Sequence, residues 1–302
     1  MSEQNNEQAP VQENKVEQAP KGRTKKKRKK LKMFLFFISI AFIFWWFNNY
    51  TLATKNYVIF SDKINTDFRI AVLSDLHASK YGISNDKILN TIEKSNPDIV
   101  FILGDMYSRR SDDSLIQIPI NLTKMIVQSG YTVYFIPGDH DTSREYINAI
   151  SESGAHVMDY KNEITEVKGN TIEIFGIDNV YFSSSFNLKN AFDRDDSLFS
   201  ILMAHIPNYQ CYSDFGADLT LCGDTHGGII QLPFSLGPAY YAETDEWFPE
   251  ISGKRSDIFD KGIFPYNGGS MFITSGIGSY PIAARINNRP EIAVIDIKAN
   301  QK

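Results

Sequence analysis

Cysteine is scarce in this sequence, and its scarcity excludes several classes of protein. The 302 residues include two cysteines, Cys211 and Cys222, which are too few for a disulfide framework. Cys222 ends an apolar run, so a buried thiol is favoured over a Cys211–Cys222 bridge. Neither cysteine has a second one at the close spacing of a zinc site, so neither is expected to bind a metal ion.

Basic residues are also scarce once the amino-terminal segment is set aside. The chain has 31 Lys+Arg and 36 Asp+Glu, of which residues 1–32 contain ten and four. Subtracting these leaves 21 basic against 32 acidic residues, a formal charge of about −11. A protein that binds nucleic acid through a broad basic face has the opposite balance. No nucleic-acid partner is therefore expected.

The only long uncharged apolar run lies near the amino terminus, from Met33 to Phe47. It follows residues 1–20, which repeat Glu-Gln-Ala-Pro and have little to bury, and a block of basic residues. We expect residues 1–32 to form a disordered basic tail. We expect residues 33–49 to form a transmembrane helix, although the run is close to the lower limit of about 17 residues for a span.

A cleaved signal peptide is the alternative, because a basic segment followed by an apolar one begins both kinds of sequence. The cleavage site that Thr51-Leu52-Ala53 offers is weak, and tryptophan and phenylalanine crowd the end of the run, which favours an uncleaved anchor. By the positive-inside rule the basic tail stays in the cytoplasm. The sequence thus predicts a single-pass protein of the cell membrane whose folded domain, beyond about residue 50, is extracytoplasmic.

Residues 50–66 are expected to form a linker and a lead-in strand, and after them five apolar runs each end at aspartate or histidine. In chain order the runs end at Asp75 and His77, at Asp105, at Asp139 and His140, at His205, and at Asp224 and His226. Open α/β sheets place their ligands at the carboxyl ends of strands. Four of the five histidines lie at these ends, which indicates a shared site. The fifth, His156, is expected to be structural.

Helical patterns between the runs predict an α/β fold. Apolar spacing indicates helices at Asn85–Lys94 and Arg144–Glu152, and a third at Ser111–Ser129 that Pro119 interrupts. Helices between strands fit successive crossovers of a parallel sheet. Residues 229–269 are rich in proline, glycine and aromatic residues without clear periodicity, and they are predicted to form a long surface loop near the site.

Aspartate and histidine bind divalent first-row metals, and two such ions about 3.5–4 Å apart can clamp the oxygens of a displacement at phosphorus. The chain has Asp-x-His at 75–77, Gly-Asp at 104–105, Gly-Asp-His-Asp at 138–141, His205 and Gly-Asp-Thr-His at 223–226. In this order the motifs resemble the calcineurin-like metallophosphoesterase superfamily over about residues 67–297. The resemblance implies a two-sheet α/β sandwich at residues 67–302. It also implies hydrolysis of a phosphodiester, pyrophosphate or phosphomonoester by a metal-bridging hydroxide.

Motifs later in the chain point to one subgroup of this superfamily. They are Thr225-His226-Gly227-Gly228 followed by Gln231-Leu232-Pro233, and Ser275-Gly276-Ile277-Gly278 followed by Arg285 and Pro290-Glu291. These look like membrane-anchored bacterial proteins grouped with UDP-2,3-diacylglucosamine pyrophosphatases and cell-wall phosphoesterases. Together with the anchor, the resemblance implies a phosphorylated small-molecule, lipid-linked or cell-wall substrate.

The resemblance also assigns roles by position. Metal site one would consist of Asp75, His77 and His226, and metal site two of Asp139, His205 and Asp224, with Asp105 bridging two divalent ions. His140 matches the family histidine that contacts the phosphate and protonates the leaving oxygen. Asp141 would either orient His140 or cap the loop, and the sequence leaves both roles open.

Two ligand positions depart from the family pattern, which has asparagine where Asp139 stands and histidine where Asp224 stands. With Asp75 and Asp105 they make four carboxylates, whose formal charge two divalent ions would cancel. Oxygen ligands favour Mn²⁺, Fe or Mg²⁺ over Zn²⁺, above all in site two. A neutral cluster favours diesters or pyrophosphates over dianionic monoesters.

Ser108 is a smaller departure, since many relatives have aspartate there to support the catalytic histidine. The altered ligands leave an alternative function open. A catalytically weak descendant of the same fold would bind metal or an envelope ligand without turning it over.

Overall fold

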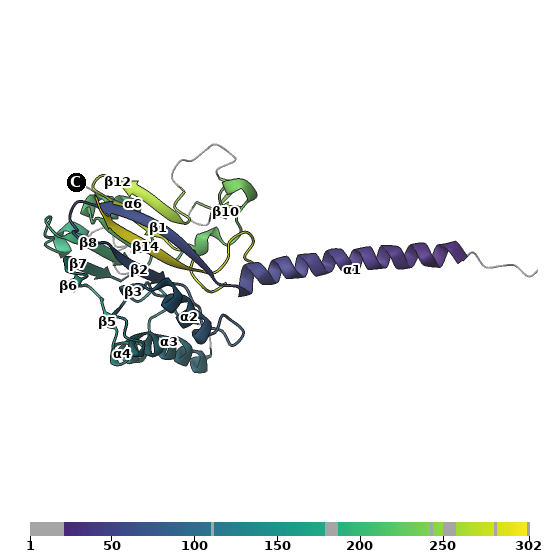
Figure 1. The fold of residues 1–302 in the computed structure, drawn as a ribbon, viewed down its shortest axis with the longest axis horizontal. Helices are drawn as coiled ribbons and strands as arrows, with labels where there is room; N and C mark the ends of the chain where they lie inside the picture. Colours follow the sequence, from purple (N-terminus) through teal and green to yellow (C-terminus); the bar gives the residue numbers. More distant parts are fainter. Residues whose placement is uncertain are drawn as a thin grey trace, which may run out of the picture. The chain divides into compact units, whose positions relative to one another are not determined.

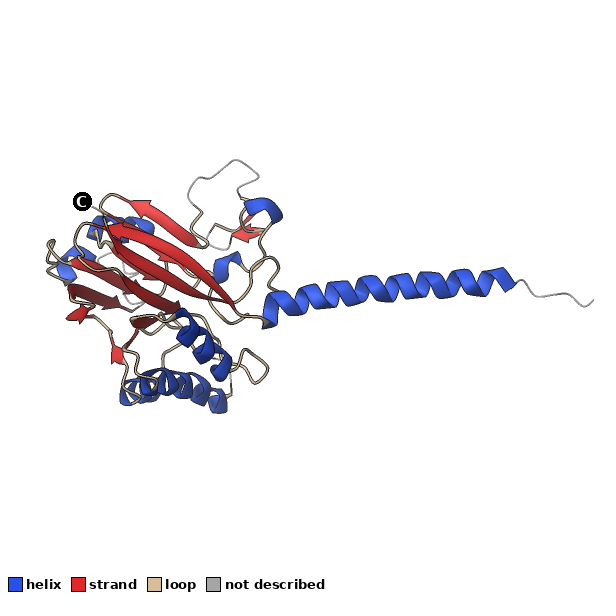
Figure 2. Cartoon of the chain, viewed as in Figure 1, coloured by secondary structure: helices blue, strands red, loops and turns tan. Residues whose placement is uncertain are grey.

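The computed structural model of the chain describes residues 21–109, 112–178, 187–241, 244–249, 258–280 and 283–300. Residues 1–20, expected to be disordered, lie outside this part. The contacts divide the chain into two units, residues 1–44 and residues 45–302. The second unit contains all the strands that the structure describes (Figures 1 and 2).

The apolar run is part of one continuous helix, α1 (Lys21–Tyr50), which also includes the basic residues before it. The prediction of a disordered tail is therefore wrong for residues 21–32, which are helical. Lysine and arginine are good helix formers, so the helix is longer than the predicted span of residues 33–49. Its part from Lys25 to Tyr50, 26 residues, is long and apolar enough to cross a membrane, and a signal sequence would have the same features. A helix of this length extends about 39 Å, which exceeds the roughly 30 Å of bilayer hydrocarbon.

Two six-stranded sheets form the centre of the second unit. The order in the first is β1 (Ala53–Ser61), β14 (Glu291–Ala299), β2 (Phe68–Leu73), β3 (Ile99–Ile102), β4 (Val133–Phe135) and β5 (His156–Val157). The order in the second is β12 (Gly262–Tyr266), β13 (Gly269–Ile273), β9 (Leu219–Cys222), β8 (Phe199–Ala204), β7 (Asn170–Ile177) and β6 (Lys161–Val167). Strands β2 to β5 are parallel, as are β7, β8, β9 and β13. A separate hairpin pairs β10 (Tyr240–Tyr241) with β11 (Glu246–Trp247).

Helices cover the outer face of each sheet, and the result is the two-sheet α/β sandwich that the sequence predicted. The first sheet is covered by α2 (Asn85–Ser95), α3 (Gln117–Gln128) and α4 (Arg144–Glu152), and the second by α5 (Leu188–Ala191) and α6 (Tyr209–Phe215). Short 3-10 helices lie at Asp113–Ile116, His226–Gly228 and Pro233–Ser235. The main core lies between the two sheets.

Strand β2 shows why the apolar runs do not alternate with polar residues. Ile70 and Val72 face the core between the sheets, while Ala71 and Leu73 face the core beneath the helices. All four side chains are fully buried. A strand buried on both faces consists mainly of apolar residues. Arg69, near the start of β2, is the polar exception and is partly buried, and Ser74 and Asp75 follow the last residue of the strand.

Several local predictions are confirmed. Helix α4 has the predicted bounds, and α2 ends one residue later than predicted. Both cysteines are free, with Cys222 buried at the end of β9 and Cys211 partly buried in α6. The buried-thiol interpretation therefore holds.

Two predictions are wrong in detail. Pro119 does not interrupt a helix. It lies in the first turn of α3, where its missing N–H has no partner to lose. Residues 229–269 are not a loop throughout, because they contain β12 and the first residue of β13. Strand β12 contains Pro265 and lies at the edge of its sheet, where proline is tolerated but the usual strand signal is lost.

Candidate metal centre

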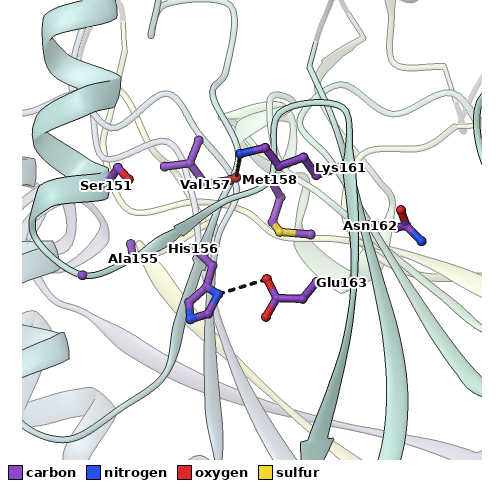
Figure 3. Close-up of a pocket in the computed structure, with 9 residues that line it drawn as sticks. Ser151, Ala155, His156, Val157, Met158, Lys161, Asn162 and Glu163 are labelled. Carbon is purple, nitrogen blue, oxygen red and sulfur yellow. Dashed lines mark hydrogen bonds and ion pairs between the residues drawn. The ribbon is translucent and has the colours of Figure 1, made fainter.

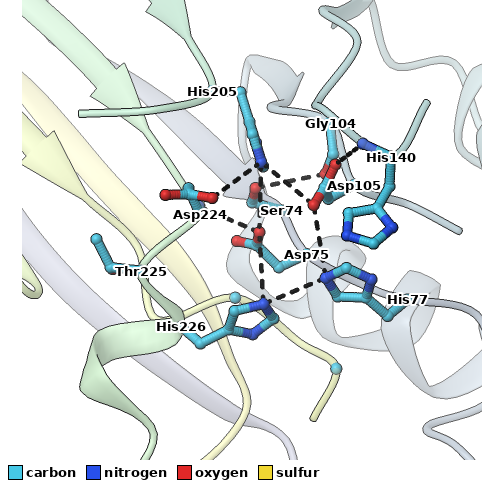
Figure 4. Close-up of polar contacts among 12 residues, drawn as sticks. Ser74, Asp75, His77, Gly104, Asp105, His140, His205, Asp224, Thr225 and His226 are labelled. Atoms are coloured by element: carbon cyan, nitrogen blue, oxygen red, sulfur yellow. Dashed lines mark hydrogen bonds and ion pairs between the residues drawn. The ribbon is translucent and has the colours of Figure 1, made fainter. Parts of the chain in front are cut away.

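The carboxyl ends of five strands meet in one place, and the predicted site residues lie there (Figure 4). The strands come from both sheets, β2, β3 and β4 from the first and β8 and β9 from the second. Four overlapping groups of side chains have ligand atoms within 4.8 Å of one another. They are Asp75, His77 and His226; His77, Asp105 and His140; Asp75, Asp105 and His205; and Asp139, His205 and Asp224. By distance alone, each group could hold a metal ion.

Site one is deeply buried. Asp75 is fully buried, and His77 and His226 are 7% and 8% exposed. The Nε2 atoms of His77 and His226 lie 3.2 Å apart. Two imidazole nitrogens bound to one ion at about 2.1 Å lie about 3.0–3.4 Å from each other at tetrahedral or octahedral angles. The observed spacing therefore suits one shared cation.

The inner nitrogen of His205 faces a ring of carboxylates. Its Nε2 atom lies 3.4 Å from Asp105 Oδ2, 3.7 Å from Asp139 Oδ1, 3.8 Å from Asp224 Oδ1 and 3.9 Å from Asp75 Oδ1. This nitrogen is buried and makes no hydrogen bond within the described residues. Buried polar atoms normally find a partner, and a cation between these atoms would satisfy all of them.

The other nitrogen of each ligand histidine is held by a hydrogen bond. His205 Nδ1 donates to a backbone carbonyl at 2.6 Å, and His77 Nδ1 lies 2.9 Å from Ser108 Oγ. The ring of His226 forms a hydrogen bond with the backbone of Gly278. A proton on the outer nitrogen suits all three rings, and it leaves the inner lone pair free for an ion.

His140 has the opposite arrangement. Its Nδ1 accepts a hydrogen bond from the backbone N–H of Arg109 at 3.1 Å, so its proton lies on Nε2. Its ring lies edge-on to His77, with 5.0 Å between the ring centroids. A protonated Nε2 donates to an oxygen rather than binding a cation, which separates His140 from the three ligand histidines.

Asp141 holds a loop in place. Its Oδ2 atom accepts hydrogen bonds from the backbone N–H groups of Asp105, at 2.6 Å, and Gly138, at 3.0 Å, which ties the loop after β3 to the loop after β4. The loops are so close that a Cβ on Gly138 would collide with Asp105. These contacts support the loop-capping role of Asp141 over the orientation of His140.

Left-handed backbone is concentrated at the site. Five of the predicted ligands, Asp75, His77, Asp105, Asp224 and His226, have φ values of 53°, 41°, 52°, 68° and 50°. Residues other than glycine seldom adopt such values, and each costs about 1–3 kcal/mol. Strain of this kind persists where the surrounding structure fixes it, and it clusters at functional sites.

Burial also shifts the pKa values of the three side chains assigned to site one. Burial, with a smaller contribution from the Asp105 charge, raises the pKa of Asp75 to about 7. Burial lowers the pKa of His77 to about 4 and the pKa of His226 well below its ordinary value. Neutral imidazoles are the form that binds metal, and a cation would stabilise the ionised form of Asp75. The residues therefore fit divalent ions.

Tyr280 is a residue of the site that no sequence pattern marked. Its ring stacks on His77 with centroids 4.5 Å apart and lies edge-on to His140 at 5.0 Å. Its position two residues after the Ser275–Gly278 motif is the only signal that could have found it. Ser108, a departure at the sequence level, supports His77 and not His140.

A pocket of about 310 Å³ lies elsewhere, bordered by α4, β5 and β6 (Figure 3). Within it His156 Nδ1 lies 3.0 Å from Glu163 Oε2, and the His156 ring packs on Tyr134 at 4.7 Å. No predicted ligand lines this pocket. His156 has the structural role that the sequence predicted.

The sequence and the fold are similar to those of known proteins. The sequence pattern of calcineurin-like phosphoesterases matches residues 68–228, which include all the predicted ligands. The metallophosphoesterase YkuE of Bacillus subtilis is 26% identical over 242 residues, covering 77% of this chain and 79% of YkuE. The phosphodiesterase YaeI of Escherichia coli is 23% identical over 245 residues, covering 76% and 82%. The structure of TT1561 of Thermus thermophilus aligns with a TM-score of 0.45 at 10% identity, covering 70% of this chain and 91% of that one.

Proposed function

Because this chain belongs to the calcineurin-like phosphoesterase family and is a hydrolase of phosphoric esters, we propose that it cleaves phosphodiesters or pyrophosphates with two divalent cations. The convergence of Asp and His side chains from both sheets carries the proposal. The phosphodiesterase name of YaeI supports the preference for diesters.

The two sites would divide the ligands between them, with Asp105 shared. Site one would take Asp75, His77 and His226, and site two Asp139, His205 and Asp224. When bound, the cations supply Lewis-acid polarisation of the phosphoryl oxygens and lower the pKa of water. The side chains supply the geometry, because their hydrogen bonds fix each ring and each loop before a substrate enters.

His140 would act on the substrate directly. Its Nε2–H is available because Nδ1 is held by the backbone N–H of Arg109. From this position it would donate a hydrogen bond to a phosphoryl oxygen or to the leaving oxygen as negative charge develops there. The ring of Tyr280 restricts its movement.

The balance of ligands favours hard ions in site two. That site would have two carboxylates besides the bridging one, and a single imidazole. Oxygen-rich sites of this kind suit Mn²⁺, Mg²⁺ or Fe better than Zn²⁺. Metal analysis of protein purified without chelator should find no zinc in site two. Stoichiometric zinc in both sites would contradict this assignment.

The charge of the centre favours substrates with less charge on each phosphorus. Four carboxylates and two divalent cations sum to a neutral cluster, which attracts a dianionic monoester less than a more cationic centre would. Turnover of a bis-aryl phosphate should therefore exceed that of the mono-aryl phosphate with Mn²⁺ bound, and a clear monoester preference would refute the proposal. A parent protein inert with every metal, together with an active Asp139→Asn/Asp224→His variant, would instead support a ligand-binding function.

We further propose that α1 anchors the catalytic unit outside the cytoplasmic membrane. Its length and apolarity support this, and the basic residues that precede the apolar run would remain in the cytoplasm. Lipid-linked or cell-wall phosphates would then be within reach. A reporter enzyme that requires export, fused after residue 302, should be active, and full activity of a reporter that works only in the cytoplasm would contradict the topology.

A further inference from the structure

Arg285 lies behind site one and is entirely buried. Its guanidinium donates to the carbonyl oxygens of Ser275 at 2.7 Å, Gly278 at 2.9 Å and Asn288 at 3.4 Å, and its Nη2 lies 3.5 Å from His226 Nδ1. No carboxylate pairs with it directly in the described part of the chain. Burying a charged guanidinium without a carboxylate partner costs free energy. Arg285 is therefore expected to have a role other than filling space in the core.

The guanidinium forms hydrogen bonds with a turn, residues 275–278, that packs against the side chains of site one. The N–H of Gly278 donates to the carbonyl of Asp75 at 2.6 Å. Gly276 has a φ of 66°, and a Cβ on it would lie 2.7 Å from the Cβ of Asp75. The backbone of Gly278 also bonds the ring of His226. A displacement of this turn would therefore move two of the three side chains of site one.

The side chain of Asn49 forms hydrogen bonds with the backbone of Arg285. Its Oδ1 accepts from the Arg285 N–H at 2.9 Å, and its Nδ2 donates to the Arg285 carbonyl at 3.1 Å. One side-chain amide thus satisfies both backbone polar groups of Arg285. Asn49 is 6% exposed and lies in the last turn of α1, within the compact unit that begins at Trp45. Trp45 adds a hydrogen bond from Nε1 to the carbonyl of Ala283 at 2.9 Å.

We propose that Asn49 is a positioning residue for metal site one and that it acts through Arg285. The last turn of the apolar helix is then part of the support for Asp75 and His226. The proposal rests on the proposed role of these two residues as metal ligands. Asp139 and Asp224 make no hydrogen bond or ion pair with Arg285 in the described residues, so site two should not depend on Asn49.

Thr51 offers a matched control. Its Oγ1 donates to the carbonyl of Phe47 at 2.6 Å and accepts from Nε of Arg289 at 2.9 Å. Thr51→Val therefore removes hydrogen bonds of the same kind, within the helix end and to the segment after Arg285, without touching Arg285 itself. A purely structural role for Asn49 would make Asn49→Leu and Thr51→Val behave alike.

The test is a Co²⁺ titration of the full chain in detergent micelles after metal has been removed with a chelator. Site one is isolated by Asp139→Ala with Asp224→Ala, and the visible absorption of bound Co²⁺ reports both affinity and coordination geometry. In this background Asn49→Leu should weaken Co²⁺ binding by about 10–100-fold and change the absorption band, as loss of outer support for a metal ligand does. Thr51→Val should change the affinity by no more than about twofold.

Equal Co²⁺ affinities for Asn49→Leu and Thr51→Val would overturn the proposal. So would an equal loss at site two, measured after Asp75→Ala with His226→Ala. If Asn49→Leu does not fold, Asn49→Asp keeps the oxygen that accepts from the Arg285 N–H and replaces the donor with a second, negatively charged oxygen. That variant should show a smaller weakening, and unchanged affinity would overturn the proposal. If the Asp139→Ala/Asp224→Ala protein with Asn49 intact binds no Co²⁺, the proposed metal centre is refuted as well. If it binds Co²⁺ and the Asn49 variants bind equally well, only the role of Asn49 is refuted and the proposed function stands.

Discussion

The two halves of the proposed metal centre differ in how deeply the fold buries them. At site one, Asp75, His77 and His226 are at most 8% exposed. At site two, the side chains of Asp139 and Asp224 are 50% and 38% exposed. The proposed site one is thus built into the core, while the carboxylates of the proposed site two are open to solvent although its histidine, His205, is fully buried.

The two sites also have opposite compositions. Site one has two imidazoles and one carboxylate, whereas site two has one imidazole and two carboxylates. Buried imidazoles select and retain an ion, while exposed carboxylates accept hard ions and release them readily. The difference suggests a division of labour in which site one holds a resident ion and site two exchanges its ion.

The largest effect is expected when the buried site is broken. Asp75→Asn should lower kcat/KM by about 10³-fold, because the ion of site one contributes several kcal/mol to the transition state. Metal analysis should find one ion fewer per chain. A variant that retains both ions would contradict the assignment of Asp75 to site one.

The thermal stability of the metal-free Asp75→Asn variant shows whether Asp75 serves metal binding or the stability of the fold. Burial raises the pKa of Asp75 in the fold to about 7, above its value in the unfolded chain, so the ionised carboxylate opposes folding as pH rises through about 7. At pH 8 the metal-free Asp75→Asn variant should therefore unfold at no lower temperature than the metal-free parent. Unfolding at a clearly lower temperature would show that Asp75 stabilises the fold itself.

His140 is assigned to neither metal site, and its substitution tests that assignment. His140→Asn should lower kcat by about 10²-fold, the lower end of the usual contribution of an acid or base group, with both ions retained. Steady-state kinetics and metal content measured on the same preparation decide the outcome. Loss of an ion would make His140 a ligand and remove its distinction from the other three histidines.

Making the exposed site resemble the buried one should change its metal preference. Asp139→Asn with Asp224→His replaces two carboxylates by neutral ligands, so the affinity of site two for Zn²⁺ relative to Mn²⁺ should rise by about tenfold or more. Competition titrations against the parent measure the ratio. An unchanged ratio would show that these carboxylates do not set the selectivity of site two.

The smallest effect is expected from the outer support of His77. Ser108→Ala removes the partner of His77 Nδ1 and should weaken metal binding at site one by about tenfold, without change at site two. Ser79→Ala is a suitable control, because in the described part of the chain the Ser79 hydroxyl accepts a hydrogen bond from the backbone of Tyr81 and contacts no predicted ligand. Equal behaviour of the two variants would mean that the Ser108 contact does not support the ligand.

The positions of the ligands could be predicted from the sequence, because strands buried on both faces are mainly apolar runs and the ligands follow where these runs end. Leu73 closes β2, and Asp75 follows two residues later. The resemblance to a family then indicated which metal site each side chain belongs to. Fold class followed from the same strands and from the helices between them.

The supports of the ligands could not be predicted, because each depends on a bond between distant parts of the chain. Asp141 meets the backbone of Asp105, 36 residues earlier, and Asn49 meets Arg285, 236 residues later. No periodicity in the sequence records such pairs. Tyr280 was missed for the same reason, since only the folded loop brings it to His77.

The pairing of β1 has a consequence for biosynthesis. Its nine residues pair in parallel with β14, from Ala53 opposite Glu291 to Ser61 opposite Ala299, so strand and partner are separated by almost the whole sequence. Contacts of such separation form slowly. Until they form, both edges of β1 are open to other chains, whereas in the folded sheet β1 is the edge strand and β14 covers one of its two edges. The protein should therefore rely on a chaperone from the time β1 is synthesised until β14 is added.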